Sequence, residues 1–206
     1  SNDEAAKIFA SKYEIEIEKW DVSSYEETKK AIEKIKSKHG QIDILVNNAG
    51  ITKDAPLHKM KKESWDAVIN VNLNSIFNLT SNVINDMRDS GFGRIIHISS
   101  VNGQKGQFGQ TNYSATKAAM EGFSKSLALE SASKGITSNV ISPGYINTEM
   151  VAAIREDILN NIIETIPAKR LGESNEIAEM VLYLISENAG YINGATFSIN
   201  GGLYMD

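Results

Sequence analysis

The feature that most constrains the fold is an alternation of short apolar runs with longer amphipathic windows, repeated along the 206 residues. Short apolar runs bounded by turn residues are typical of strands, and windows with apolar residues every three to four positions are typical of helices. Strands that alternate with helices form βαβ units, whose strands pair in parallel. The pattern therefore predicts an α/β protein built on a parallel sheet.

The alternation resolves into five strands and five helices. The strands are predicted at Tyr13–Trp20, Ile42–Val46, Arg94–Ser99, Ile136–Ile141 and Ala195–Ile199. The helices are predicted at Tyr25–Lys38, Trp65–Met87, Thr111–Glu130, Ile154–Ile166 and Glu173–Ser186. No long linker, repeat or low-complexity tract interrupts them, so we expect residues 1–206 to form a single domain.

Composition narrows the classes of function. The chain is 41% apolar, enough for a sizeable core, and its net charge of −5 argues against a nucleic-acid partner. The absence of cysteine excludes disulfides, thiolate metal sites and cysteine nucleophiles. No apolar run approaches the roughly 18–20 residues of a membrane span, and no secretory signal is recognised. We expect a cytoplasmic enzyme with no membrane partner and no metal.

Polar and glycine residues follow the predicted strands where each one ends: Asp21, Asn47-Asn48-Ala49-Gly50, Ser99-Ser100 and Pro143-Gly144. In open parallel sheets, ligands bind beyond the carboxyl ends of the strands. The pattern predicts one site assembled from several loops.

Tyr113 and Lys117 lie four residues apart in a predicted helix, and therefore one turn apart on the same face. A free phenol has a pKa of about 10, too high for efficient proton exchange near neutrality, and a nearby ammonium lowers it. The spacing suits an acid/base unit. The alternative is an ordinary surface face of the helix.

Three further features sharpen this hypothesis, each with a plainer alternative. Ser100 follows a strand and can donate to a carbonyl oxygen, or simply cap a turn. Asn72 falls on an apolar helix stripe, where it either holds a water or neighbouring group, or is a locally satisfied buried amide. The small residues of Asn47-Asn48-Ala49-Gly50 admit a flat ring or sugar, or form an ordinary turn.

Together these residues resemble the short-chain dehydrogenase/reductase family, with a Rossmann-type doubly wound parallel sheet. The matching motifs are Asn47-Asn48-Ala49-Gly50, Asn72, Ser100, Tyr113-x-x-x-Lys117 and Pro143-Gly144, and the resemblance runs from about Trp20 to the C-terminus.

Within the family, residues 99–114, 142–146 and 200–205 resemble acetoacetyl-CoA reductases of the polyhydroxybutyrate type. The sister group is the 3-oxoacyl-acyl-carrier-protein reductases. These often carry Arg at the position of Gly91, linked to carrier-protein docking, whereas Lys134 keeps the charge at a second such position. The Gly91 departure favours a CoA thioester.

The resemblance implies a mechanism. NADPH delivers hydride to C3 of a 3-oxoacyl thioester, acetoacetyl-CoA, to give the (R)-3-hydroxy product; a carrier-protein thioester is the alternative substrate. Ser100 hydrogen-bonds the ketone oxygen, Tyr113 donates the proton, and Lys117 lowers the pKa of Tyr113 and binds the nicotinamide ribose. Asn72 supports a water that relays protons to Lys117.

The resemblance also assigns binding residues and an assembly. Those expected at the cofactor are Asp21, Val22, Asn48, Ala49, Gly50, Tyr113, Lys117, Pro143, Gly144, Tyr145 and Ile146. Those expected at the substrate are Asp54, Ser100, Gln107, Gln110 and Tyr145. A homotetramer is expected, with Trp65–Met87 and Thr111–Glu130 as packing surfaces.

The family's opening strand, Gly-x-x-x-Gly-x-Gly turn and helix do not occur, because no glycine precedes Gly40. That turn holds the cofactor pyrophosphate at a helix N-terminus. Gly103-x-x-Gly106-x-x-Gly109 does not replace it, and we expect these glycines to leave room for substrate. Either the 206 residues are part of a longer protein, which we favour, or the product is truncated, with poor stability and no dinucleotide affinity.

Two rival functions remain. A Ser/His/Asp hydrolase is disfavoured because no Gly-x-Ser-x-Gly occurs and His97 and Ser100 point to opposite faces. A non-catalytic binding or scaffold protein has only the missing cofactor segment in its favour. Four lysines are expected near the mouth of the site, where they either attract a CoA phosphate or form a solvated basic face: Lys53, Lys59, Lys61 and Lys62.

Overall fold

Four parallel strands form the centre of the protein in a computed structural model, which describes residues 3–148, 151 and 154–205. The strands are β1 (Ile44–Asn47), β2 (Gly93–Ile98), β3 (Ile136–Pro143) and β4 (Thr196–Ile199), hydrogen-bonded in that order. Every neighbouring pair is parallel, with Val46 opposite Ile96 and Ile96 opposite Asn139. The prediction of a parallel α/β sheet is confirmed.

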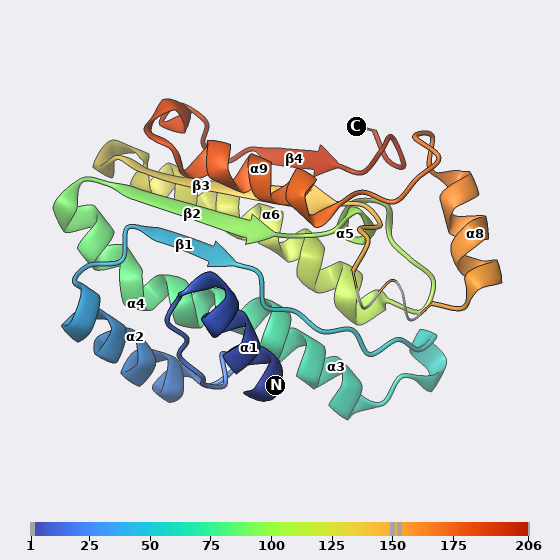
Figure 1. Ribbon diagram of the computed structural model, residues 1–206, viewed down its shortest axis with the longest axis horizontal. Coiled ribbons are helices and arrows are strands. Elements are labelled where there is room, and N and C mark those ends of the chain that lie inside the picture. The colour runs from blue at the N-terminus through green and yellow to red at the C-terminus, as the bar shows by residue number, and fades with distance from the viewer. Residues whose placement is uncertain (1–2, 149–150, 152–153, 206) are drawn as a thin grey trace.

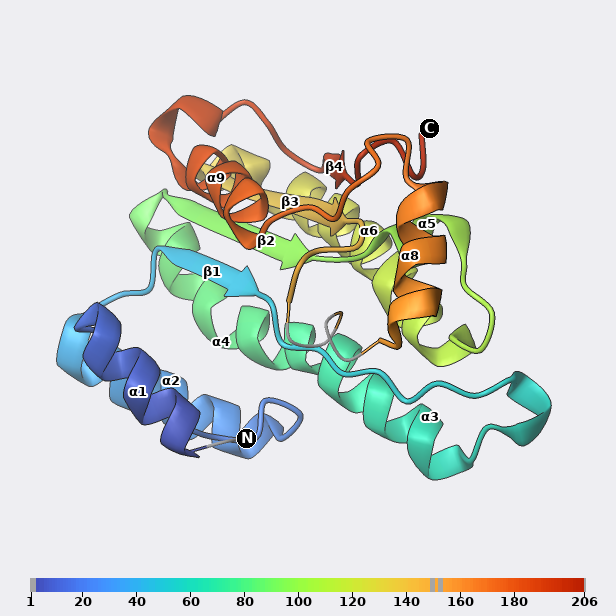
Figure 2. The same ribbon diagram turned by 45° about the vertical axis from the view of Figure 1, so that its right-hand side comes forward.

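Helices cover both faces of this sheet (Figures 1 and 2). The helical segments are α1 (Asp3–Tyr13), α2 (Tyr25–His39), η1 (Leu57–Lys59), α3 (Lys62–Ile69), η2 (Asn70–Asn74), α4 (Ser75–Ser90), α5 (Val101–Lys105), α6 (Thr111–Ser131), η3 (Ala132–Lys134), α8 (Glu156–Thr165), α9 (Ser174–Ile185) and η4 (Glu187–Ala189). Helices α4 and α6 pack on one face, and α9 packs on β2 and β3 from the other. This doubly wound arrangement is the Rossmann-type fold that was predicted.

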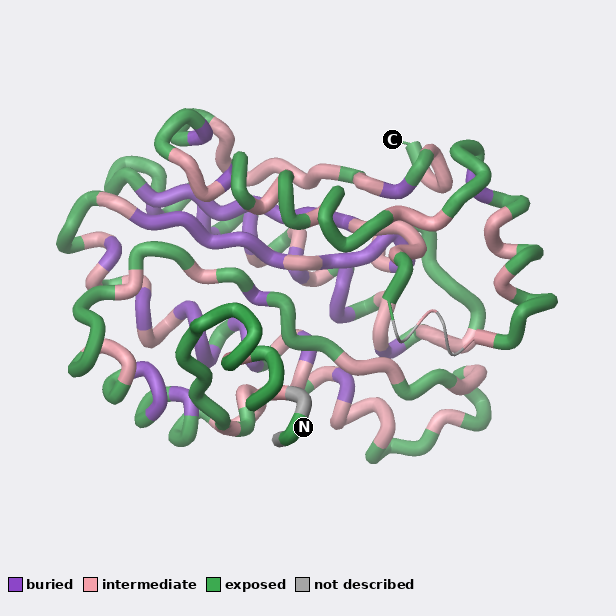
Figure 3. Tube along the Cα trace, viewed as in Figure 1, coloured by how far each residue is buried: buried purple, intermediate pink, exposed green. Residues whose placement is uncertain are grey.

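The side chains of β2 alternate between the two layers, as the period of a strand requires. Ile95 joins a core with Val83 of α4 and Leu127 of α6, whereas the next residue, Ile96, joins a second core with Leu184 of α9. Burial is concentrated along β2 and β3, and much of β1 is exposed (Figure 3). The strand ends that follow the two buried strands are therefore held by packing on both faces.

The predicted strand Tyr13–Trp20 is wrong. Tyr13 closes helix α1, and residues 15–21 carry no regular secondary structure. An alternating segment forms a strand only where a neighbour accepts its backbone hydrogen bonds, and the sheet of the described residues ends at β1. The charged residues of this segment instead pair with α2, where Glu16 contacts Lys38 and His39.

The predicted helix Trp65–Met87 is one continuous helical path with a change of pitch in its middle. Helix α3 passes into the π-helical segment η2, and α4 continues from it. Such π-segments are rare and occur frequently at functional sites. This one contains Asn72, one of the predicted site residues. The short helix α5 was not predicted, because five residues are too few to show a helical period.

Candidate active site

The carboxyl ends of β1, β2 and β3 point in the same direction, and a cleft opens beyond them. Its lining comes from the loop after β1, from α5 and α6 after β2, and from the loop after β3. The lining residues are Thr52, Asp54, Ser100, Val101, Asn102, Gln110, Tyr113, Gly144, Tyr145, Ile146, Thr148, Val151 and Ile154. Segments far apart in the sequence thus contribute to one cavity.

Ser100 and Tyr113 are brought together because the chain between them folds back through α5. Ser100 begins α5, where its Oγ accepts a hydrogen bond from the backbone N–H of Asn102 at 3.1 Å. The side chain of Asn102 donates to Gln110 Oε1 at 3.0 Å, just before α6 starts. Ser100 is therefore a capping residue and also a wall of the cleft, so the two interpretations of its role are compatible.

The three glycines between Ser100 and Tyr113 have structural roles in the backbone. A Cβ at Gly103 would lie 2.8 Å from Lys117 Cβ, so α5 packs against α6 only because residue 103 has no side chain. Gly106 and Gly109 have positive φ angles of 72° and 80°, which L side chains rarely adopt. The prediction that these glycines leave room for substrate is wrong for Gly103, and for Gly106 and Gly109 it stays a prediction.

Tyr113 and Lys117 lie one turn apart on α6, as their spacing predicts. The ammonium of Lys117 is 5.5 Å from the centroid of the Tyr113 ring, and its Nζ donates to the carbonyl oxygen of Ile98 at 2.7 Å. Lys117 is 3% exposed, and this burial lowers its pKa to about 8. A buried cation is thus held directly beneath the phenol.

The pKa of Tyr113 departs from its usual value in the direction opposite to the prediction. Burial of the phenol raises this pKa, the interaction with the Ser100 side chain lowers it, and the charge of Asp54 raises it. Desolvation disfavours the phenolate more than the neighbouring groups favour it. In the protein alone, Tyr113 is therefore kept protonated, the state required of a proton donor.

Asn72 is completely buried, and its hydrogen bonds explain why its helix tolerates an amide there. Its Oδ1 accepts from the backbone N–H of Ile51 at 2.8 Å, and its Nδ2 donates to the carbonyl of Ile51 at 3.0 Å and to Thr116 Oγ1 at 3.3 Å. A Cβ at Gly50 would lie 3.5 Å from Lys117 Nζ and 3.6 Å from Asn72 Oδ1. Asn72 thus ties the loop after β1 to α6 beside Lys117. Its support of a proton relay stays a prediction.

Three of the other predicted substrate residues, Asp54, Gln110 and Tyr145, share the cleft, and the fourth does not. Asp54 Oδ2 accepts from Gln110 Nε2 at 2.8 Å, and both residues line the cleft with Tyr145, whose pKa is raised by burial and by Asp54. Gln107 is exposed on the loop between α5 and α6, where its Oε1 accepts from Lys105 Nζ at 2.9 Å. Gln107 is absent from the lining of the cleft.

The predicted cofactor residues form an edge that leads to Lys117. Asn48, Ala49 and Gly50 are exposed after β1, whereas Pro143 ends β3 and is half-buried, as are Gly144 to Ile146 after it. Asp21 accepts hydrogen bonds from the backbone and side chain of Ser23, which lowers the pKa of Asp21, and the carbonyl of Val22 accepts from Asn78 at 3.0 Å.

The loop at Gly50 is the part of this set that could hold the ribose of a nicotinamide. The open backbone at Gly50 lies directly over Lys117 and Asn72, where a side chain would fill the space. A glycine-rich turn for the pyrophosphate is not found before Gly40.

The sequence did not single out Asn112 and Thr116, although both shape the site. Asn112 is fully buried; its Oδ1 accepts from the backbone N–H of Tyr113 at 2.8 Å and its Nδ2 donates to the carbonyl of Lys53 at 3.1 Å. Thr116 donates to the carbonyl of Tyr113 at 2.7 Å. An Asn in the first turn of a predicted helix is a signal that was available, because such residues hydrogen-bond free N–H groups there.

The histidines do not form a hydrolase triad. His97 is fully buried, with Asn47 Nδ2 at 3.2 Å from its Nδ1 and Ser138 Oγ at 3.2 Å from its Nε2. Burial and the charge of Lys117 lower the pKa of His97 to about 4, so it stays neutral near pH 7. His39 pairs with Glu16 beside α2. In the described part of the chain, no hydrogen bond joins a histidine to Ser100.

Neither a metal-binding cluster nor a long apolar helix occurs among the described residues. No three of their His, Cys, Asp or Glu side chains are grouped so as to hold a metal ion. None of their helices combines the length and the apolar character needed to cross a bilayer.

A family model and several known proteins match the chain over most of its length. A family model described as enoyl-(acyl carrier protein) reductase matches residues 1–204. The chain belongs to the short-chain dehydrogenase/reductase family of nicotinamide-dependent oxidoreductases.

Individual relatives are similar over most of the chain. An acetoacetyl-CoA reductase of Shinella zoogloeoides is 58% identical over 205 residues, which are 99% of this chain and 85% of the relative. An acetoacetyl-CoA reductase of Cupriavidus necator is 56% identical over 184 residues, 89% of this chain and 75% of the relative. A 3-oxoacyl-acyl-carrier-protein reductase of Haemophilus influenzae is 48% identical over 184 residues, with 89% and 76% covered.

Proposed function

We propose that the protein reduces a 3-oxoacyl thioester with NADPH, and that its substrate is acetoacetyl-CoA, which gives (R)-3-hydroxybutyryl-CoA. The observation that carries the proposal is the meeting of Ser100 and Tyr113 in one cleft, with the buried ammonium of Lys117 beneath the phenol. The acetoacetyl-CoA reductases among the relatives support the choice of substrate.

Each side chain near the ketone has one role in the reduction. Ser100 Oγ donates a hydrogen bond to the ketone oxygen and so stabilises the negative charge that develops there. Tyr113 gives its phenolic proton to that oxygen, and the charge of Lys117 stabilises the phenolate that remains. When bound, a nicotinamide would supply the hydride to C3. The exposed residues Asn48 to Gly50 would hold its ribose together with Lys117.

The remaining polar residues position the thioester and the catalytic groups. Asp54 and Gln110, joined by a hydrogen bond of 2.8 Å, together with Tyr145 form the wall that faces the acyl group. Asn72 holds Ile51 and Thr116 and supports the return of a proton to Lys117. Asp21 and Val22 flank the adenine.

A carrier-protein thioester is the alternative substrate, supported by the relative from Haemophilus influenzae. Gly91 gives little help in the choice. It ends α4 with φ 72°, so a glycine there is explained by the backbone alone. Lys53, Lys59 and Lys61 are exposed and offer cations to the phosphates of CoA, whereas Lys62 already pairs with Asp66.

The assembly and location are part of the same proposal. We propose one domain over residues 1–206, acting in the cytoplasm as a homotetramer. Phe77 on α4 and Leu129 on α6 are 58% and 86% exposed, and an interface over them would remove apolar surface from water. Light scattering of the purified protein at micromolar concentration tests the tetramer, and a monomer contradicts it.

The substrate proposal is tested by NADPH oxidation with acetoacetyl-CoA and acetoacetyl-carrier protein side by side. We expect the larger kcat/KM for the CoA thioester. A larger value for the carrier-protein thioester selects the alternative. If the protein reduces neither thioester, the proposed function is wrong. Nucleotide titration then separates an enzyme that acts on other substrates from a non-catalytic binding protein.

A further inference from the structure

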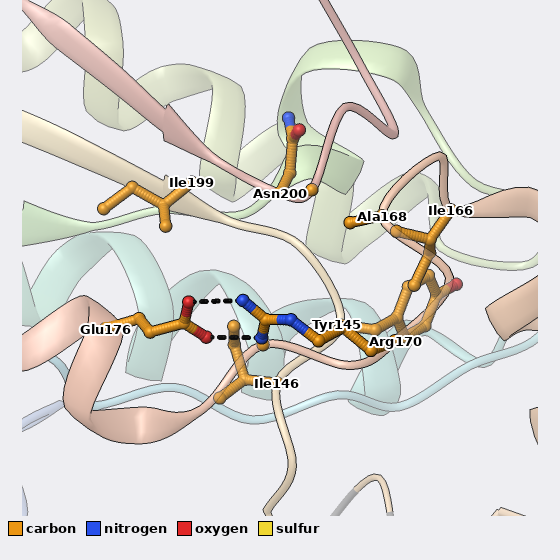
Figure 4. Close-up of a pocket in the computed structure, with 10 residues that line it drawn as sticks. Tyr145, Ile146, Ile166, Ala168, Arg170, Glu176, Ile199 and Asn200 are labelled. Carbon is orange, nitrogen blue, oxygen red and sulfur yellow. Dashed lines mark hydrogen bonds and ion pairs between the residues drawn. The ribbon is translucent and has the colours of Figure 1, made fainter.

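A small cavity lies behind the loop that forms one wall of the cleft (Figure 4). Tyr145 and Ile146 line both the cleft and this cavity, so their backbone is the partition between the two. Arg170 and Glu176 also line the cavity, and their side chains point toward each other. Whatever fixes this partition also fixes the cleft wall that carries Tyr145.

The partition is held by backbone hydrogen bonds to Gly172, and the side chain of Asn147 also donates to Glu173 Oε1 at 3.4 Å. The N–H of Gly172 donates to the carbonyl of Tyr145 at 2.9 Å, and the N–H of Asn147 donates to the carbonyl of Gly172 at 2.8 Å. These bonds form an isolated parallel bridge between Ile146 and Gly172. The approach is close, because a Cβ at residue 172 would lie 2.7 Å from Ile146 Cδ1.

The carboxylate of Glu176 holds the residues on both sides of Gly172. Glu176 receives two hydrogen bonds from the guanidinium of Arg170, at 2.7 and 2.8 Å, and its Oε2 also accepts from the backbone N–H of Glu173 at 2.7 Å. The residues on both sides of Gly172 are thereby anchored to the first turn of α9. Lys169, just before them, has a positive φ of 54°, a conformation that surrounding contacts must hold in a residue other than glycine.

An exposed ion pair contributes little to global stability. The Arg170 and Glu176 side chains are 58% and 42% exposed, so their effect is expected where their hydrogen bonds lead. The bidentate geometry fixes orientation as well as distance. The ion pair therefore fixes the position of Gly172, and Gly172 in turn holds the cleft wall.

We propose that Arg170 and Glu176 are positioning residues for the substrate cleft: their ion pair fixes Gly172, which holds the backbone of Tyr145 and Ile146 in place. The inference rests on the proposed function for its kinetic consequence. Its structural consequence, a fixed loop at residues 145–147, holds whatever the substrate is.

The test compares the wild-type protein with Arg170→Met, which removes the pair and leaves the Glu176 cap of α9 intact. Lys34→Met is the control, because Lys34 forms an exposed ion pair with Glu18, far from the cleft, at 2.7 Å. For Arg170→Met we expect a roughly ten-fold rise in KM for acetoacetyl-CoA, with kcat changed less than about three-fold. Hydrogen exchange at the amides of Asn147 and Gly172 should become faster.

The outcomes separate this inference from the proposed function. Unchanged hydrogen exchange at the amides of Asn147 and Gly172 in Arg170→Met overturns the positioning role. An Arg170→Met variant that keeps the wild-type KM and differs only in having less folded protein also overturns it. If the wild-type protein turns over no thioester, the proposed function fails and exchange alone decides the positioning role. Arg170→Lys keeps the charge without the bidentate fork and should give intermediate values. It serves as the readout if Arg170→Met does not fold.

Discussion

Replacing Lys117 by Met should stabilise the protein at pH 7 while it removes the activity. Burial lowers the pKa of Lys117 from 10.5 to about 8. One pKa unit corresponds to about 1.4 kcal/mol, so the difference of 10.5 − 8 = 2.5 corresponds to roughly 3 kcal/mol for keeping the ammonium charged in the core. The hydrogen bond to Ile98 offsets about 1–2 kcal/mol of this. We expect Lys117→Met to gain about 1–2 kcal/mol.

The difference in stability between Lys117→Met and the wild-type protein should depend on pH. Between pH 8 and 10.5 the unfolded chain keeps Lys117 protonated while the folded protein releases that proton. The unfolded state therefore binds more protons, and the contribution of Lys117 to stability rises with pH across this window. Below pH 8 both states are protonated and the full penalty remains. The Met variant lacks the rise, so its advantage should shrink from pH 7 to pH 10.

Urea denaturation of both proteins at pH 7 and pH 10 measures the difference. Lys125→Met is the matched control, since Lys125 is an exposed lysine of the same helix, and its difference from wild type should stay near zero at both pH values. A Lys117→Met variant less stable than wild type at pH 7 would refute the reasoning. So would a stability difference that is the same at both pH values.

Three further predictions concern neighbouring groups. Ser100→Ala should lower kcat by about 100-fold or more in steady-state assays, because the donor to the ketone oxygen is lost, and a kcat within a few-fold of wild type contradicts that role. Gly103→Ala should destabilise by about 1–3 kcal/mol in urea, since the new Cβ would lie 2.8 Å from a side-chain carbon of α6. Its control is Gly122→Ala on the open side of α6, which should be neutral or stabilising. Asp54→Asn removes a charge that raises the pKa of Tyr113, so the alkaline limb of the pH–rate profile should move to lower pH; an unmoved limb contradicts this.

The sequence predicted the parts of the site that depend on spacing along one element. Tyr113 and Lys117 meet because four residues make about one turn of α6, and Ser100 faces the cleft because it follows a strand of a parallel sheet. The strand-end loops lie together for the same reason. These relations are set by the periods of helices and strands, and they hold wherever the elements themselves form.

The features that sequence reasoning missed depend on contacts between elements. The segment Tyr13–Trp20 alternates like a strand, but its state depends on a neighbouring strand and not on its own residues. The lowered pKa expected for Tyr113 assumed the charge of Lys117 alone, whereas burial of the phenol dominates. Arg170 lies in a turn without periodicity and Glu176 in the first turn of α9, so the link of this pair to Tyr145 is visible only in three dimensions.

The central claim is that Tyr113 is the proton donor in the reduction of a 3-oxoacyl thioester. The most direct measurement is the rate of NADPH oxidation with saturating acetoacetyl-CoA in Tyr113→Phe, with Tyr183→Phe on the exposed face of α9 as control. Removing a general acid lowers the rate by about 100-fold or more, so Tyr113→Phe should lose at least that factor while Tyr183→Phe keeps the wild-type rate. A Tyr113→Phe variant that reduces acetoacetyl-CoA at the wild-type rate contradicts the account.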